Sequence, residues 1–403
     1  MKKVVLVNAV LLIFLVVVFD VFSYWLVPDR YLHPYKDYRR IPFPNELGVA
    51  GWPRNYYEPI EAKGFDIGSM RTARLWVDGT FFPIWSNSIG CFDREHATFA
   101  NYVYFAGDSF TWGYARFEDK FGTLVEQESG MPIVKCGVEH TGQRHQYAKF
   151  IEIVERTKSV PKAVFVFHFE NDIANDHAYP HSTVVEGWLI DSVVTNDRHE
   201  LIRRSPQELL VKFTERLERD RLKLLDEQRG TGGSWGTLKA SIKRYSLTAN
   251  LASAALKPSQ DSLAVTTGQA GERPPANFYT IPYMANGAYS YVDNAYAKEN
   301  QTALLDFKSW TERNGVPLII VLIPRIRTSF DPTWYGEMHQ FLRQNQIRFL
   351  DLASAFQEKQ LDPKELYWRN DPHFNRMGNK IVAKVLLDSF PEYFRPRQFK
   401  RDE

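Results

Sequence analysis

Several features that often decide a function at first sight are scarce in this chain. Only two cysteines, Cys91 and Cys136, occur in 403 residues. They lie at no metal-ligand spacing and cannot build a disulfide framework, although one bridge can form if the chain is exported. Charge of one sign is not in excess either, since 50 Lys and Arg face 48 Asp and Glu. Nucleic-acid binding therefore has no electrostatic support.

The rest of the composition is typical of a folded chain. Hydrophobic residues make up 44% and charged residues 24% of the sequence, which is enough apolar material for a large core. Length alone predicts two to three domain-sized units, and no internal repeat divides them.

Residues 4–27 predict a membrane-spanning helix. The stretch is apolar except at Asn8 and Asp20, and about 20 such residues suffice to cross a bilayer. Bulky residues such as Tyr24 and Trp25 stand where a signal peptide would need small ones, which favours an uncleaved anchor. Lys2 and Lys3 precede the span, so the positive-inside rule predicts a single-pass signal anchor in the cell membrane with the C-terminal part extracytoplasmic. A buried helix of a soluble domain is the alternative.

The remainder of the chain predicts an α/β domain with a preface and an insertion. Short apolar runs alternate with helical patterns over 98–176 and 297–395, as in an α/β domain around a parallel sheet. Residues 28–97 are rich in aromatics and turns and predict a small β-containing preface. Residues 177–296 interrupt the alternation, and the capping box at Ser205 and Glu208 predicts that this insertion is mostly helical or irregular.

Candidate catalytic residues follow the predicted strands. Ser109 stands in Gly107-Asp108-Ser109-Phe110, directly after a strand, where a tight turn exposes its hydroxyl. Near the C-terminus, Asp371 and His373 stand in a loop before the last helix, so the carboxylate can orient the imidazole as a general base.

Donors for an oxyanion are expected from two further strand-end loops. Gly142 offers an unobstructed backbone N–H, and Asn171 offers a side-chain amide. A histidine cluster at His177 and His181 is a weak metal signal because Pro180 lies between the two residues. We therefore expect no metal ion and no cofactor.

In these blocks the chain resembles the SGNH (GDSL-type) hydrolases. Gly-Asp-Ser-Phe at 107–110, Gly142, Asn171-Asp172 and the Asp371/His373 loop match the four family blocks in order. The resemblance implies a three-layer α/β/α, flavodoxin-like fold. It also implies Ser109 as nucleophile, His373 as base with Asp371 as its partner, and Ser109 N–H, Gly142 and Asn171 as the oxyanion hole.

The match departs from the common family pattern at two places. Aspartate stands two residues before His373, where most members space the pair by three, and this form resembles envelope members that include polysaccharide O-acetyltransferases. Phe169 stands two residues before Asn171, where the family commonly has glycine.

The expected function is a serine esterase that hydrolyses acyl esters, with acetyl groups on an envelope or extracellular carbohydrate as the favoured substrate. The alternatives are an O-acetyltransferase of a cell-envelope polysaccharide, which would need a membrane partner that delivers the acyl group, a lipid esterase, and a glycan-binding protein that has lost catalysis. The motifs do not separate these alternatives.

Overall fold

The structure is a computed structural model. It describes residues 53–77, 80–196, 200–215, 217–218, 284–285, 288–325, 329–368 and 371–394, together with scattered helical residues between 7 and 22.

The chain divides into two units, one made of residues 1–44 and 216–274, the other of residues 45–215 and 275–403. Nearly all of the first unit lies outside the described residues, and so does most of the predicted anchor at 4–27. Within the described part of the chain, no helix combines the length and apolar character needed to cross a membrane.

A five-stranded parallel sheet forms the centre of the second unit. Its strands, in spatial order, are β15 (Arg348–Asp351), β14 (Leu318–Leu322), β7 (Ala163–His168), β5 (Val103–Gly107) and β6 (Ile133–Gly137). This confirms the predicted α/β domain with a parallel sheet. Because all strands run in one direction, the loops that follow them meet at one edge of the sheet.

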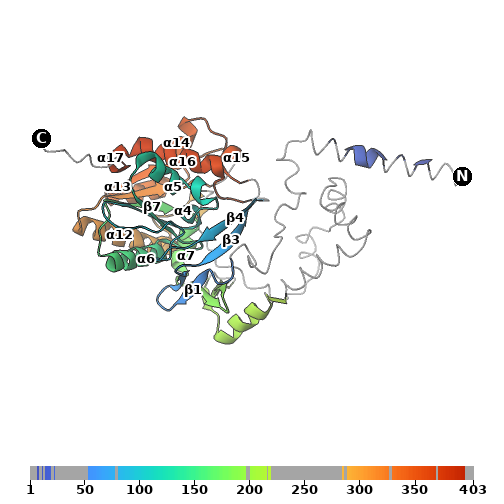
Figure 1. Ribbon diagram of the computed structural model, residues 1–403, viewed down its shortest axis with the longest axis horizontal. Helices are drawn as coiled ribbons and strands as arrows, with labels where there is room; N and C mark the ends of the chain where they lie inside the picture. Colours follow the sequence, from blue (N-terminus) through green and yellow to red (C-terminus); the bar gives the residue numbers. More distant parts are fainter. Residues whose placement is uncertain are drawn as a thin grey trace. The chain divides into compact units, whose positions relative to one another are not determined.

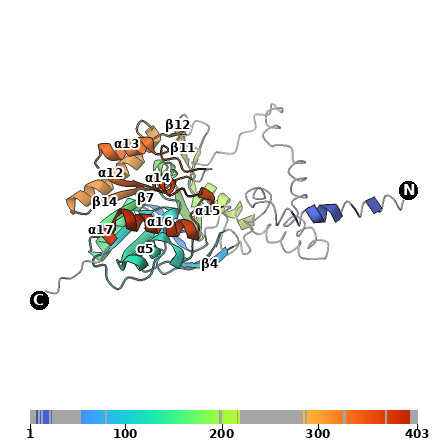
Figure 2. The ribbon, with the colours of Figure 1, turned by 90° about the horizontal axis from the view of Figure 1, so that it is seen from above.

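Helices cover both faces of this sheet (Figure 1). One face carries α6 (Gln143–Thr157), α12 (Lys298–Arg313) and α13 (Gly336–Gln344). The other carries α5 (Phe121–Ser129), α14 (Leu352–Glu358), α15 (Pro363–Leu366), α16 (Arg376–Ser389) and α17 (Pro391–Phe394). In Figure 2, α5 and α16 lie side by side over the sheet.

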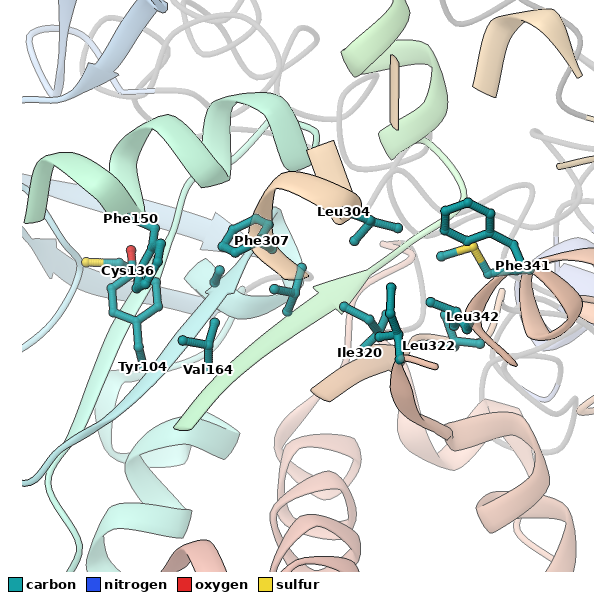
Figure 3. Packing of buried hydrophobic residues seen from close by; sticks show 14 of the residues in the cluster. Tyr104, Cys136, Phe150, Val164, Leu304, Phe307, Ile320, Leu322, Phe341 and Leu342 are labelled. Carbon is teal, nitrogen blue, oxygen red and sulfur yellow. The ribbon is translucent and has the colours of Figure 1, made fainter. Parts of the chain in front are cut away.

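Alternation along the strands fills two separate cores. In β7, Val164 and Val166 belong to the core under α6 and α12, whereas Phe165 and Phe167 belong to the core under α5 and α16. Successive strand side chains point to opposite faces, so a strand that is apolar at every position is buried on both. Figure 3 shows the first core, in which side chains of α6 and α12 face those of the strands.

The described part of the preface consists of two hairpins and packs onto this domain. Its strands are β1 (Tyr57–Ile60), β2 (Gly64–Ile67), β3 (Thr72–Val77) and β4 (Thr80–Trp85). Buried Asp66 of β2 forms ion pairs with Lys63 and with Lys149 of α6. Cys91 and Cys136 form a disulfide, with Cα atoms 4.9 Å apart, that ties the end of the preface to β6.

The described start of the insertion contains strands that the sequence analysis did not predict. After α7 (Asp172–His177) it begins with two antiparallel pairs, formed by β8 (Ser182–Val185) with β9 (Trp188–Asp191) and β10 (Val193–Thr195) with β11 (Leu201–Arg203). The turn residues Glu186 and Gly187 both have positive φ, 50° and 82°, which suits a two-residue hairpin. A Gly-containing turn between two short runs of apolar and β-branched residues was the sequence signal for this hairpin.

The predicted capping box is confirmed. Ser205 N donates to the Glu208 carboxylate at 2.6 Å, and Glu208 N donates to the Ser205 hydroxyl at 3.3 Å. A helix runs from there over 206–215. The continuation of the insertion to residue 283 lies outside the described residues. Two short strands, β12 (Met284–Ala285) and β13 (Ala288–Tyr289), and the 3₁₀ turn η5 (Ala295–Ala297) lead back to α12.

Candidate active site

Ser109 stands at the start of a four-residue helix directly after β5. The helix, α4 (Ser109–Trp112), is capped by Asp108, whose carboxylate accepts the Phe110 N–H at 3.0 Å. Gly137 at the end of β6 lets α4 approach, because a Cβ at this glycine would collide with the backbone of Thr111 and Trp112. The nucleophile candidate is therefore held by a buried cap and by close backbone packing.

His373 and Asp371 meet Ser109 across the sheet edge. His373 Nε2 lies 2.7 Å from Ser109 Oγ, and His373 Nδ1 lies 2.6 Å from Asp371 Oδ1. The same carboxylate oxygen accepts the His373 backbone N–H at 3.0 Å. The three side chains thus form one hydrogen-bonded chain in the order Ser, His, Asp. This arrangement lets the imidazole take a proton from the hydroxyl while the carboxylate holds the other ring nitrogen.

Carboxylates around the imidazole favour its protonated form. Burial alone would lower the pKa of His373, but the charge and hydrogen bond of Asp371, with smaller contributions from Asp108 and Glu139, raise it above the ordinary histidine value. Burial raises the pKa of Asp108 to about 6, although hydrogen bonds from Phe110 and Ser109 oppose this shift. The site is therefore built to stabilise an imidazolium.

Two side chains fix the loop that carries His373. The Trp368 N–H donates to the His373 carbonyl at 2.9 Å, and the Trp368 indole donates to the Tyr114 carbonyl at 2.6 Å. The Asn375 amide donates to the carbonyls of Glu365 and Tyr367, and its oxygen caps α16 at Gly378 N. This loop is consequently anchored on both sides of His373.

Gly142 lies on the loop after β6 and caps the first turn of α6. A Cβ at this position would overlap the Asp176 carboxylate and crowd the Asp172 carbonyl. Asp176 itself accepts the N–H groups of Gln143 and Arg144 at 3.0 and 2.8 Å. Close packing of this buried carboxylate explains why glycine stands here.

Asn171 follows β7, the neighbour of β5 in the sheet. Its side chain makes no cap hydrogen bond to α7, and its Oδ1 is buried without a hydrogen-bond partner among the described residues. Phe169, two residues before Asn171, packs its ring on Phe110 at 4.7 Å. The Phe110 ring in turn contacts the His373 imidazole at 4.8 Å.

The other candidates from the sequence have structural partners. His181 Nε2 bonds the His140 carbonyl at 2.8 Å, and His177 packs against the Tyr296 ring. Arg325, on the loop after β14, pairs with Glu170 at 3.3 Å. No group of three or more ligating side chains suited to a metal ion occurs in the described ranges.

Two residues of the site were missed by sequence reasoning. Tyr114 stacks on His373 with ring centres 3.9 Å apart and planes 3° from parallel, and Glu139 is a fully buried carboxylate on the loop after β6. A glutamate two residues after the end of β6, at the predicted catalytic edge, was the available signal for Glu139. Nothing in the sequence marks Tyr114 as a neighbour of His373.

Comparisons with known proteins were made at three levels. No family model matches the chain, and no curated protein matches it. Among solved structures, the chain is similar to a lipase/acylhydrolase from Enterococcus faecalis, with 11% identity, a TM-score of 0.35, and coverage of 74% of this chain and 99% of that one. It is also similar to a catalytic mutant of an acetylxylan esterase from Geobacillus stearothermophilus, with 13% identity, a TM-score of 0.36, and coverage of 75% and 100%. Similarity at this level does not establish a family, so the functional argument depends on the site geometry.

Proposed function

We propose that this chain is a serine esterase of the SGNH type that cleaves acyl esters through an acyl-enzyme. The observation that carries the proposal is the chain of short contacts from Ser109 Oγ to His373 Nε2 and from His373 Nδ1 to Asp371 Oδ1, at 2.7 and 2.6 Å. A serine hydroxyl is a weak nucleophile by itself, and a positioned base with its own carboxylate partner is what activates it.

In the proposed reaction, Ser109 Oγ attacks the ester carbonyl carbon while its proton passes to His373 Nε2. The oxyanion formed on the carbonyl oxygen accepts hydrogen bonds from the N–H groups of Ser109 and Gly142 and from the Asn171 amide. His373 then gives its proton to the leaving alcohol, which breaks the ester C–O bond and leaves the acyl group on Ser109. In the second half, a water molecule attacks the acyl carbonyl carbon while its proton passes to His373 Nε2. His373 then returns the proton to Ser109 Oγ, and the carboxylic acid is released.

A short acyl group is the proposed substrate, with an acetylated carbohydrate as the alcohol part. Phe169 stands where the resembled family commonly has no side chain, and its ring joins Phe110 beside His373. These rings favour an acyl group as small as acetyl. The Asp-x-His form of the last block, which resembles envelope members of the family, favours a carbohydrate.

The proposed location is the cell membrane, with the catalytic unit outside the cytoplasm and residues 4–27 as anchor. The disulfide between Cys91 and Cys136 supports this proposal, because disulfides persist in oxidising compartments and are rare in the cytosol.

The substrate proposal is tested with the full chain in detergent micelles. Acetate release from acetylated xylan and from p-nitrophenyl acetate is measured beside hydrolysis of p-nitrophenyl octanoate. We expect acetyl esters to be cleaved with the higher kcat/KM, and Ser109→Ala to lower the rate by at least about 10³-fold. A higher kcat/KM for p-nitrophenyl octanoate would contradict the carbohydrate substrate and favour a lipid ester. Acetyl transfer to an added glycan in excess of hydrolysis would make the protein a transferase, which then needs an acyl-donor partner in the membrane.

A further inference from the structure

The imidazole of His373 is covered on one face by an aromatic ring. Tyr114 stacks on it almost in parallel, with 3.9 Å between ring centres and an interplanar angle of 3°. Tyr114 follows α4 through Gly113, whose φ of 91° turns the chain there. The ring acts on the face of the imidazole, whereas Ser109 and Asp371 bind its edge nitrogens, so the stack is a separate interaction.

The backbone around Tyr114 is tied to the loop that it covers. The Trp368 indole donates to the Tyr114 carbonyl, and the Trp368 backbone N–H donates to the His373 carbonyl. Trp368 therefore links the backbone of Tyr114 to the backbone of His373 and holds the two stacked rings in place.

A buried carboxylate, Glu139, also acts on His373. It accepts the Tyr57 hydroxyl on Oε2. Burial raises the pKa of Glu139 to about 7, and hydrogen bonding from the Tyr114 and Tyr57 phenols partly offsets that rise. Oε1 has no hydrogen-bond partner in the part of the chain that the structure describes. The preface thus contacts this carboxylate through Tyr57.

An aromatic face attracts a cation more strongly than a neutral ring of the same shape. The imidazole of His373 changes from neutral to cationic when it takes the Ser109 proton, so a ring on its face stabilises the later state more than the earlier one. Interactions that strengthen on the way to the transition state are those that raise the rate.

We propose that Tyr114 is a positioning residue that holds the His373 ring and stabilises its imidazolium through the aromatic face. The inference rests on the proposed function, since it assigns a proton transfer to His373. Besides Tyr114, the charged groups that act on His373 are Asp371, Asp108 and Glu139.

The test measures the rate of fluorophosphonate labelling of the full chain against pH, because labelling requires neutral His373. Removal of the ring by Tyr114→Leu is expected to move the midpoint of the acid limb down by about 0.5 to 1.5 pH units. The plateau rate is expected to fall about 2- to 30-fold. Tyr114→Phe keeps the ring and should restore a midpoint close to the wild type.

Tyr147→Leu serves as the matched control. Tyr147 is also half-buried and contacts a phenylalanine, Phe307 of α12, but it lies on α6 outside the site. Its midpoint and plateau should equal those of the wild type. If Tyr114→Leu does not fold, 3,4,5-trifluorophenylalanine is placed at position 114, because fluorine withdraws charge from the ring face without changing its shape. A midpoint below that of Tyr114→Phe is then expected.

An unchanged midpoint in Tyr114→Leu, or in the fluorinated protein, would overturn the proposal. A smaller labelled fraction with an unshifted midpoint would do the same, since it would mean that Tyr114 only supports folding. Failure of the proposed function is distinguishable, because the wild type itself would then not label. NMR titration of the His373 ring in the wild type and in Tyr114→Leu reads the same shift without any reaction.

Discussion

Replacing Asp371 by asparagine tests the electrostatics of the site with little change in shape. The carboxylate lies 2.6 Å from His373 Nδ1. An opposite charge at about 4 Å between charge centres contributes roughly 4 kcal/mol at an effective dielectric constant of 20. Because the Asp371 side chain is 27% exposed, solvent screening reduces this figure. A loss of about 1.5 to 3 kcal/mol of imidazolium stabilisation remains, which corresponds to about 1 to 2 pH units in the pKa of His373.

The direction of the pH effect follows from the base role of His373. Asp371 raises the pKa of His373, so wild-type activity is lost as the pH falls through a value above about 6.5. In Asp371→Asn that value is lower, and the acid limb of kcat/KM moves to lower pH. The plateau falls about 10²- to 10⁴-fold, because the imidazolium is less stable and its tautomer is no longer fixed.

The assay is the pH dependence of p-nitrophenyl acetate hydrolysis by the full chain, with circular dichroism to verify folding. Asp362→Asn is the matched control. Like Asp371, Asp362 accepts the backbone N–H two residues farther along the chain, here that of Lys364, but it lies at the start of α15 and not beside His373. Its pH profile should equal that of the wild type. The assigned role of the carboxylate would be refuted by two results together. The acid limb of Asp371→Asn would keep its wild-type position, and its plateau would stay within about threefold of the wild-type value.

Three further predictions concern other parts of the second unit. Gly142→Ala is expected to lower kcat about 10²-fold with unchanged circular dichroism, because a Cβ displaces the proposed oxyanion loop from Asp176; an unchanged kcat would argue against that loop. Cys91→Ser with Cys136→Ser should cost about 4 kcal/mol of unfolding free energy in urea, from the 45-residue separation that the bridge closes, and a loss below about 1 kcal/mol would contradict the pairing. Asp66→Asn leaves Lys63 and Lys149 without their carboxylate and should cost about 3 to 5 kcal/mol in the same assay, whereas a neutral change would mean that these lysines find other partners.

The α/β domain was predictable because its central strands, β5, β7 and β14, consist almost entirely of apolar residues. Runs such as Ala163–His168 read as strands that are buried on both faces, and the structure places each of them in the parallel sheet. The start of α16 at Arg376 follows from its cap residue Asn375, whose side chain accepts the Gly378 N–H. In the insertion, the helix after the capping box at Ser205 was predicted from its cap, whereas the hairpin at Glu186 and Gly187 was not predicted.

The three residues of the Ser–His–Asp chain in the candidate site were also predictable. Asp371 and His373 stand two apart in one loop, and Ser109 follows a strand that ends at the same edge, so their meeting depends on the parallel topology alone. Tyr114 and Glu139 contact the site through packing between loops that are remote in sequence. Pattern reasoning does not resolve such contacts, because side-chain stacking depends on distances between loops rather than on residue spacing.

The most direct test of the account is the reaction of the full chain with a fluorophosphonate probe, with the modified residue identified by peptide mass spectrometry. We expect a single adduct on Ser109, no adduct in Ser109→Ala, and strongly slowed labelling in His373→Ala. Absence of labelling in well-folded wild-type protein, or an adduct at another serine that persists in Ser109→Ala, would contradict the claim that Ser109 is an activated nucleophile.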